Sequence, residues 1–69
     1  MTVQKLLDYI KKDFCIRDLY INHKLQNSLC IEKDILDKDF YNWGSKRLNK
    51  EGLADIYINL DEENGLKGY

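Results

Sequence analysis

An amphipathic segment at the start of the chain most constrains its fold. Five apolar residues fall within roughly a 100° arc at 3.6 residues per turn, the width of a core-facing helical stripe. They are Val3, Leu6, Leu7, Ile10 and Phe14. The opposite side carries Lys5, Asp8 and Lys12, and Thr2 has a side chain suited to capping the first turn. These residues predict an amphipathic helix over about residues 2–13.

The chain has room for one domain, residues 1–69. A chain of 69 residues buries only about 60% of its unfolded surface, so its core is small. Hydrophobic residues make up 43% and charged residues 33% of the sequence, which is typical of globular proteins and excludes disordered and collagen-like classes. No apolar run approaches the roughly 20 residues of a membrane span. No basic patch precedes an apolar segment at the N-terminus, so we also expect no secretory signal.

The charge balance disfavours a general nucleic-acid binder. Lys and Arg number 11 against 12 Asp and Glu, for a net charge of −1, whereas phosphate binding usually needs a clear basic excess. A DNA mimic would be strongly acidic, and this chain is not. The charges are unevenly distributed, because Lys46, Arg47 and Lys50 form a basic group between acidic flanks.

The cysteines indicate a reducing environment. Cys15 and Cys30 are the two cysteines, whereas small secreted domains usually have about four to eight. We therefore expect free, half-buried thiols and a cytoplasmic protein. With His23 they could be considered as zinc ligands, but they lie too far apart for ligand pairs separated by about two to five residues. We expect no metal and no other cofactor, and His23 is expected at the surface or at its boundary.

The middle of the chain leaves its secondary structure open. Residues 14–22 fit either an extension of the first helix or a short strand, since β-branched and aromatic residues are enriched there. A second stripe falls within about 60° on a helical wheel and predicts helix. It comprises Leu25, Leu29, Leu36 and Phe40. Glu32 interrupts the stripe, which predicts two short helices with a break inside residues 31–39 and with Asp34 and Asp39 available as caps.

A further helix is predicted over residues 40–51, from an Asp39 cap to Gly52 at its C-terminal end. Its apolar side would carry Phe40, Tyr41, Trp43, Arg47 and Leu48. Its polar side would carry Asn42, Ser45, Lys46 and Asn49, with Lys50 at the edge. Gly44 costs about 1 kcal/mol relative to Ala inside a helix, which indicates either a closely packed neighbour or a helix that starts later.

A period of two begins after Gly52. Ala54, Ile56, Ile58 and Leu60 alternate with Asp55, Tyr57 and Asn59. A helical spacing also fits, but the β-branched residues favour a strand over about residues 53–60. The polar turn 61–65 ends in Asn64-Gly65, which suits a hairpin with a return strand at 66–69. The predicted fold class is therefore a small α+β domain, with helices followed by a C-terminal β-hairpin.

The sequence from Lys46 to Leu53, Lys-Arg-Leu-Asn-Lys-Glu-Gly-Leu, resembles part of a winged helix-turn-helix. It is similar to the end of a recognition helix that runs through a glycine into the first strand of the wing. The resemblance implies a winged-helix-like fold and a DNA-binding transcriptional regulator. Asn42, Ser45, Lys46 and Asn49 would then face base edges, and Lys50 would contact phosphate. However, a wing tip with Asp61, Glu62 and Glu63 would be repelled by the DNA backbone, which favours a protein partner.

The aromatic residues also indicate a protein interface. Phe40, Tyr41 and Trp43 lie within four residues, and one helix cannot bury all three equally. Tyr and Trp are frequent interface anchors, so Tyr41, Trp43 and Tyr57 are the candidate protein-binding residues. The alternative is that Trp43 simply fills the core.

These observations favour a small non-enzymatic regulator or inhibitor that docks onto a protein partner. Its size and composition are typical of accessory proteins of phages and mobile elements, and a chain this small gains core by forming a homodimer. The alternative function is a winged-helix-like regulator that binds DNA through Asn42, Lys46, Asn49 and Lys50. No glycine-rich phosphate loop or nucleophile motif predicts an enzyme. The predicted core comprises Leu6, Leu7, Ile10, Leu29, Leu36, Leu48, Ile56 and Ile58.

Overall fold

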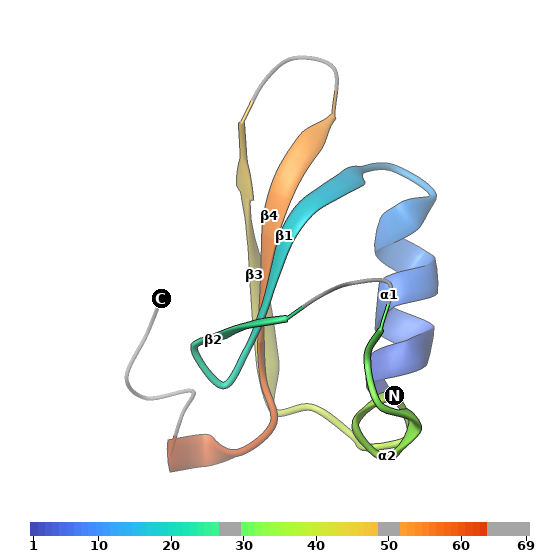
Figure 1. Cartoon of the computed structure of the whole chain (residues 1–69), viewed down its shortest axis with the longest axis vertical. Helices are drawn as coiled ribbons and strands as arrows, with labels where there is room; N and C mark the ends of the chain where they lie inside the picture. The colour runs from blue at the N-terminus through green and yellow to red at the C-terminus, as the bar shows by residue number, and fades with distance from the viewer. Residues whose placement is uncertain (27–29, 49–51, 64–69) are drawn as a thin grey trace.

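A helix comes first and packs on one face of a four-stranded sheet (Figure 1). The computed structural model describes residues 1–26, 30–48 and 52–63. The elements are α1 (Val3–Lys11), β1 (Cys15–Ile21), β2 (Lys24–Gln26), α2 (Lys33–Leu36), β3 (Asn42–Arg47) and β4 (Leu53–Asn59). The strand order is β2-β1-β4-β3, with β1 and β4 parallel at the centre and antiparallel pairs at both sides.

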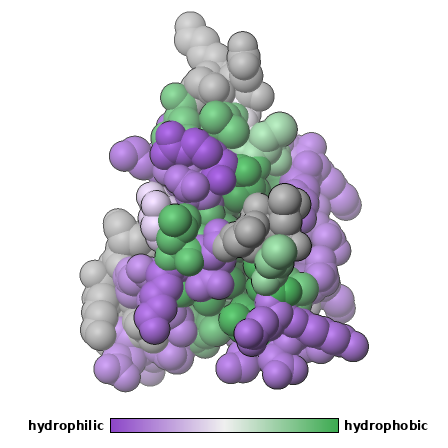
Figure 2. Space-filling model, in the orientation of Figure 1, coloured by the Kyte–Doolittle hydropathy of each residue, from purple (hydrophilic) through white to green (hydrophobic). Residues whose placement is uncertain are grey.

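The predicted first helix is confirmed. The side chain of Thr2 accepts a hydrogen bond from the backbone N–H of Lys5 at 3.3 Å, as an N-cap should. The apolar stripe is buried against the sheet, and Phe14 packs partly buried beyond the end of the helix. Figure 2 shows hydrophobic residues gathered between the sheet and α1, with hydrophilic residues on the far side of the helix.

The core lies between α1 and the two central strands. Its buried members are Val3, Leu6, Leu7, Ile10, Leu19, Ile21, Ala54, Ile56 and Ile58. Five predicted core residues are therefore confirmed: Leu6, Leu7, Ile10, Ile56 and Ile58. Leu36 and Leu48 are half-buried, and Leu29 lies outside the described residues.

Residues 15–26 form a hairpin rather than a helix. Asn22 and His23 have positive φ angles of 51° and 66°, the conformation of a two-residue turn that suits the twist of paired strands. This turn resolves the open alternative at 14–22 in favour of a strand. Leu25 lies in β2 and is 61% exposed, so the second helical stripe is wrong at this position.

The described part of residues 25–40 contains one short helix, α2. Its N-cap residue is Glu32, so Asp34 lies in the first turn rather than at the cap. Asp39 does not cap a helix. It forms instead an isolated antiparallel bridge with Thr2 and an ion pair with the amino group of Met1 at 3.6 Å. The chain therefore passes from α2 under the start of α1 before it enters the sheet (Figure 1).

The predicted helix over residues 40–51 is wrong, because residues 42–47 form strand β3. Each residue of β3 pairs with a residue of β4, from Asn42 with Asn59 to Arg47 with Ala54. Asn, Gly and Ser are poor helix formers, and pairing with β4 satisfies the backbone groups of the segment. The helix-like spacing of its aromatic residues was therefore overridden by tertiary pairing.

The predicted C-terminal hairpin is also wrong, although β4 is the expected strand. Both edges of β4 are occupied, one by β1 and the other by β3, so a return strand at 66–69 has no place beside it. Glu62 and Glu63 have helical backbone conformation instead of forming a wing tip, and residues 64–69 lie outside the described part. The winged-helix-like order of helices followed by a hairpin is replaced by a helix followed by a four-stranded mixed sheet. No helix in the described ranges has the length and apolar character needed to cross a membrane.

Candidate functional site: the outer face of the sheet

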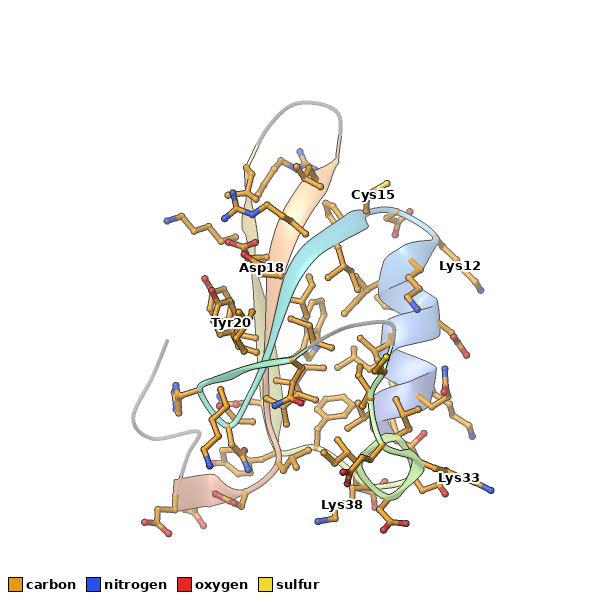
Figure 3. The ribbon with its side chains drawn as sticks, viewed as in Figure 1. Lys12, Cys15, Asp18, Tyr20, Lys33 and Lys38 are labelled. Carbon is orange, nitrogen blue, oxygen red and sulfur yellow. The ribbon has the colours of Figure 1, made fainter. Side chains whose placement is uncertain are left out.

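The face of the sheet that points away from α1, here called the outer face, carries the candidate site. Ala54, Ile56 and Ile58 are buried toward α1, and alternate residues of a strand point to opposite sides. The outer face comprises Arg17, Asp18, Tyr20, Leu25, Asn42, Gly44, Lys46, Asp55, Tyr57 and Asn59. Figure 3 shows Tyr20 and Asp18 on the side of the sheet opposite to α1. No helix of the described residues covers this face.

A central row of residues crosses all four strands. Tyr20 is in register with Leu25 on one side and with Tyr57 on the other, and Tyr57 is in register with Gly44. The rings of Tyr20 and Tyr57 are stacked, with centroids 5.0 Å apart and planes 8° from parallel. Both tyrosines are half-buried, whereas Leu25 is 61% exposed. The central row is therefore an apolar and aromatic strip at the surface.

The environment of Tyr20 keeps its hydroxyl protonated. Burial raises the pKa of Tyr20 above its usual value of 10.0, and the negative charges of Asp18 and Asp55 raise it further. A phenol that resists ionisation remains a hydrogen-bond donor at neutral and mildly alkaline pH. Tyr20 can therefore offer a donor to any ligand that covers the central row.

A charged row lies next to the central row. A bulge between Ile16 and Leu19 places both Arg17 and Asp18 beside Asp55. Arg17 donates from Nε to Oδ1 of Asp55 at 3.1 Å and from Nη2 to Oδ2 at 3.0 Å, and its Nε lies 3.4 Å from Asp18 Oδ2. The hydrogen bonds to Asp55 raise the pKa of Arg17, so its guanidinium stays charged.

The charged row is balanced in sign. Lys46 is in register with Asp55 on the side opposite to β1, so two cations face two carboxylates. Asp55 is only 4% exposed, and a buried carboxylate requires the paired, hydrogen-bonded partner that Arg17 provides. The side chain of Arg17 is therefore occupied by Asp55, and this ion pair links β1 to β4.

A row of amides borders the central row on its other side. Asn59 is 1% exposed and donates from Nδ2 to Oδ1 of Asn42 at 2.8 Å. Its own Oδ1 is buried with no hydrogen-bond partner among the described residues. A buried acceptor left in this state costs about 1–3 kcal/mol. Unsatisfied groups of this kind are rare in native proteins.

A pocket of about 400 Å³ opens beside β3 and is lined by Gly44, Ser45, Lys46 and Tyr57. Gly44 has no side chain to cover its cross-strand neighbour Tyr57. The pocket consequently combines an aromatic wall with a cation, the ammonium group of the exposed Lys46. This chemistry suits an aliphatic chain or a cation against the ring of Tyr57.

The structure divides the sequence-predicted site residues between two faces. Tyr57 lies on the outer face, whereas Trp43 is in register with the buried Ile58 and packs against the core on the α1 side. Tyr41 is 51% exposed just before β3. The three aromatics therefore do not form one surface, and Trp43 acts as part of the core.

The predicted DNA-binding residues are also divided. Asn42 and Lys46 lie on the outer face, in the two polar rows. Asn49 and Lys50 lie outside the described residues, and the segment that was to carry all four residues as a recognition helix is a strand up to Arg47.

Sequence reasoning missed the following outer-face residues: Arg17, Asp18, Tyr20, Leu25, Gly44, Asp55 and Asn59. A signal for Tyr20 was present, because Leu19-Tyr20-Ile21 and Ile56-Tyr57-Ile58 repeat the same pattern of a tyrosine between two aliphatic residues. Pairing these two segments in register would have placed both rings on one face. The bulge that places both Arg17 and Asp18 beside Asp55 has no comparable pattern in the sequence.

The cysteines differ from expectation in one respect. Cys15 and Cys30 are free but exposed, not half-buried. Across the described ranges, no group of three or more His, Cys, Asp or Glu side chains is placed to hold a metal ion.

The outer face therefore offers an apolar centre between two polar rows, on four hydrogen-bonded strands. This arrangement can bind the surface of another molecule, because its exposed groups can make apolar contacts and hydrogen bonds with it. Comparison of the chain with protein-family models, with curated proteins and with solved structures gave no match.

Proposed function

We propose that this chain is a small non-enzymatic protein that docks onto a protein partner through the outer face of its sheet. The observation that carries the proposal is the central row, with Leu25 exposed beside the stacked rings of Tyr20 and Tyr57. Protein interfaces have an apolar, aromatic centre inside a polar rim. Tyr20 and Tyr57 belong to the two central strands, which hold them in place and lower the entropy lost on binding.

The stacking of the two tyrosines favours a protein over a single-stranded nucleic acid. A platform for bases needs ring faces on which bases can lie. Tyr20 and Tyr57 each use one ring face on the other, with only 8° between their planes. On their other sides the two tyrosines have Leu25 and Gly44 as register neighbours in the central row.

The charges of the outer face also favour a protein over a nucleic acid. Nucleic-acid binding needs cations that are available to phosphates. Arg17 is held by Asp55 and Asp18, and Lys46 is the other cation among the described outer-face residues. The partner that fits this face presents an apolar side chain to Leu25 and a hydrogen-bond acceptor to the protonated hydroxyl of Tyr20.

The test compares outer-face variants with a control on α1. Affinity capture from nuclease-treated lysate of the native host supplies a partner, which is then purified and titrated by calorimetry. Leu25→Ser and Tyr20→Ser should each weaken binding by at least about 2 kcal/mol, as expected for residues at the centre of an interface. Tyr9→Ser removes a tyrosine that is 56% exposed on α1, and it should leave the affinity unchanged.

Two results would contradict the proposal. The first is a partner that binds Leu25→Ser and Tyr20→Ser as tightly as the wild type while both variants keep the wild-type circular dichroism spectrum. The second is tight binding of a labelled single strand of about 20 nucleotides that is lost in Tyr20→Ser, which would assign the outer face to nucleic acid.

A further inference from the structure

We infer that β3 pairs with the β3 strand of a second copy of this chain, joining the two sheets into one. The sheet order places β3 at an edge, and no strand in the described ranges pairs with its outward side. An unpaired edge strand presents N–H and C=O groups that can template a further strand. This inference concerns the free edge of the sheet and does not depend on the proposed partner.

The hydrogen bonds to β4 identify which residues face the edge. The N–H of Leu48 donates to the C=O of Leu53 at 2.8 Å, one step beyond the pair of Arg47 with Ala54. In an antiparallel ladder, hydrogen-bonded and non-hydrogen-bonded pairs alternate. The even-numbered residues of β3 therefore face β4, and Trp43, Ser45 and Arg47 turn their backbone groups to the edge.

These three residues are spaced evenly about Ser45, so a two-fold axis through Ser45 satisfies all of them. Ser45 then pairs with Ser45 of the second copy, and Trp43 pairs with Arg47 at both ends. Such a register makes about six backbone hydrogen bonds. Other antiparallel registers leave at least one of the three residues without a counterpart within β3.

The side chains on the α1 side are complementary in this register. The guanidinium of Arg47 already lies over the ring of Phe14, 5.1 Å from its centroid. Pairing brings Trp43 of the second copy opposite Arg47, on the same side of the joined sheet. Arg47 then has an aromatic ring from each chain, an arrangement that stabilises a guanidinium.

The outer face is complementary as well. Lys46 stands opposite Gly44 of the second copy, at the pocket that Gly44, Ser45, Lys46 and Tyr57 line in each copy. Because Gly44 has no side chain, the pocket leaves room for the aliphatic part of Lys46, and its ammonium can approach the ring of Tyr57. Charged residues on an edge normally oppose pairing, but in this register neither Lys46 nor Arg47 is directly paired with a cation of the second copy. This fit of the strand to itself identifies the occupant as a second copy.

The joined sheet has a functional consequence. A two-fold axis perpendicular to the sheet leaves both α1 helices on one side and both outer faces on the other. A dimer would therefore present two central rows together, which strengthens binding to a partner that carries two sites.

The first test measures the oligomeric state by light scattering at about 100 µM, above the micromolar range of weak interfaces. The wild type should have the mass of a dimer. Ser45→Pro should be a monomer, because proline removes the central edge-facing N–H and introduces a bulky ring. The monomer keeps its ladder, since the N–H of Ser45 does not face β4 and proline is tolerated at strand edges. Ser45→Thr keeps the N–H and should remain a dimer, and Leu25→Ser should also remain a dimer.

A second test does not depend on the fold of the proline variant. Ser45→Cys is made in a chain with Cys15→Ser and Cys30→Ser, so that one thiol remains. The register places the two Ser45 Cα atoms about 5.5 Å apart, within the range that a disulfide spans. Mild oxidation should yield a covalent dimer, whereas Asp8→Cys on α1 in the same background should form no covalent dimer. A monomeric wild type at the stated concentration, a Ser45→Pro dimer or a Ser45→Cys chain that fails to cross-link would each overturn the inference.

Discussion

Two polar residues of β4 are buried within the outer face, and the sheet satisfies them to different degrees. Asp55 has both carboxylate oxygens bonded by Arg17, so its burial is compensated. Asn59 has one bond, to Asn42, and an acceptor without a partner in the described part of the chain. The same strand thus contains a satisfied and an unsatisfied polar group four residues apart.

Replacement of Asn59 should increase stability. Asn59→Val removes the unsatisfied acceptor, worth about 1–3 kcal/mol, at the loss of a hydrogen bond worth about 0.5–1.5 kcal/mol. We expect a net gain of about 1 kcal/mol in urea unfolding. Asn42→Ala should have the opposite effect, because it leaves both polar groups of Asn59 unpaired. A loss of stability in Asn59→Val would show that the amide row stabilises the folded state as it stands.

The raised pKa of Tyr20 should make stability depend on alkaline pH. An unfolded tyrosine ionises near pH 10, and burial together with Asp18 and Asp55 raises the pKa of Tyr20 in the folded state. The folded state therefore holds this proton more tightly, so its contribution is complete below about pH 10 and is lost as pH rises toward the folded pKa. The urea midpoint should fall between about pH 9 and 11 by less in Tyr20→Phe than in the wild type.

The two proteins differ only at position 20, so the contribution of every other residue cancels in the comparison. If the urea midpoints of the wild type and Tyr20→Phe fell equally with pH, the raised pKa of Tyr20 would be contradicted. In a pH titration, the tyrosinate absorbance that the wild type has and Tyr20→Phe lacks should develop at a higher pH than the absorbance of an ordinary tyrosine.

At the scale of elements, short turns decide how the strands meet. Asn22 and His23 close the β1–β2 hairpin through left-handed conformations. Gly52 precedes β4 with a φ of +91°, and its C=O accepts from the N–H of Cys15 at 2.8 Å. That bond starts the parallel pairing of β1 with β4, so the conformation of Gly52 sets the alignment of the two central strands.

Substitution of Gly52 should be costly. A Cβ at this position would lie 3.3 Å from the backbone oxygen of Asp13, and a positive φ is unfavourable for a residue with a side chain. We expect Gly52→Ala to lower the free energy of unfolding by at least about 1 kcal/mol.

Gly44→Ala provides the matched control. Gly44 lies beside a pocket in β3 and is not among the described residues with positive φ. The same change there should be neutral or stabilising by up to about 1 kcal/mol, because alanine loses less backbone entropy on folding. If both variants lost the same free energy of unfolding, the positive φ of Gly52 would not be the cause of the loss in Gly52→Ala.

At the scale of the whole molecule, the fold is one sheet with one helical layer, and β4 is its centre. Ala54, Ile56 and Ile58 are fully buried, and β4 has a hydrogen-bonded neighbour on each side. In contrast, β2 has three residues and lies at an edge, with Lys24 and Leu25 exposed. Stability should therefore fall from the centre of the sheet to its edges.

Hydrogen exchange measured residue by residue should reveal this gradient. The amides of Ile56 and Ile58 should exchange only on global unfolding, because both residues are fully buried and their backbone groups face β1, the other central strand. The amides of β2 should exchange faster by at least about tenfold through local opening. Uniform protection across both strands would instead indicate that the sheet opens as a single unit.

Local periodicity was sufficient for two elements. The stripe of α1 repeats along a helix of nine residues, about two and a half turns, and the alternation of β4 runs through seven residues. Each pattern is long enough to specify both the element and its buried side. For this reason Leu6, Leu7, Ile10, Ile56 and Ile58 could be assigned to the core from the sequence.

The remaining elements depended on contacts between distant residues. The segment 42–47 fits a helical wheel, and only its pairing with β4 makes it a strand and sends Trp43 to the core side. The outer face has the same origin, because Tyr20 meets Tyr57, and Arg17 meets Asp55, across 37 and 38 positions of sequence. A repeat along the chain determines which side of an element is buried, since that depends only on its own geometry. Which strands become neighbours is decided by the free energy of the whole packed sheet, and here that choice created the candidate site.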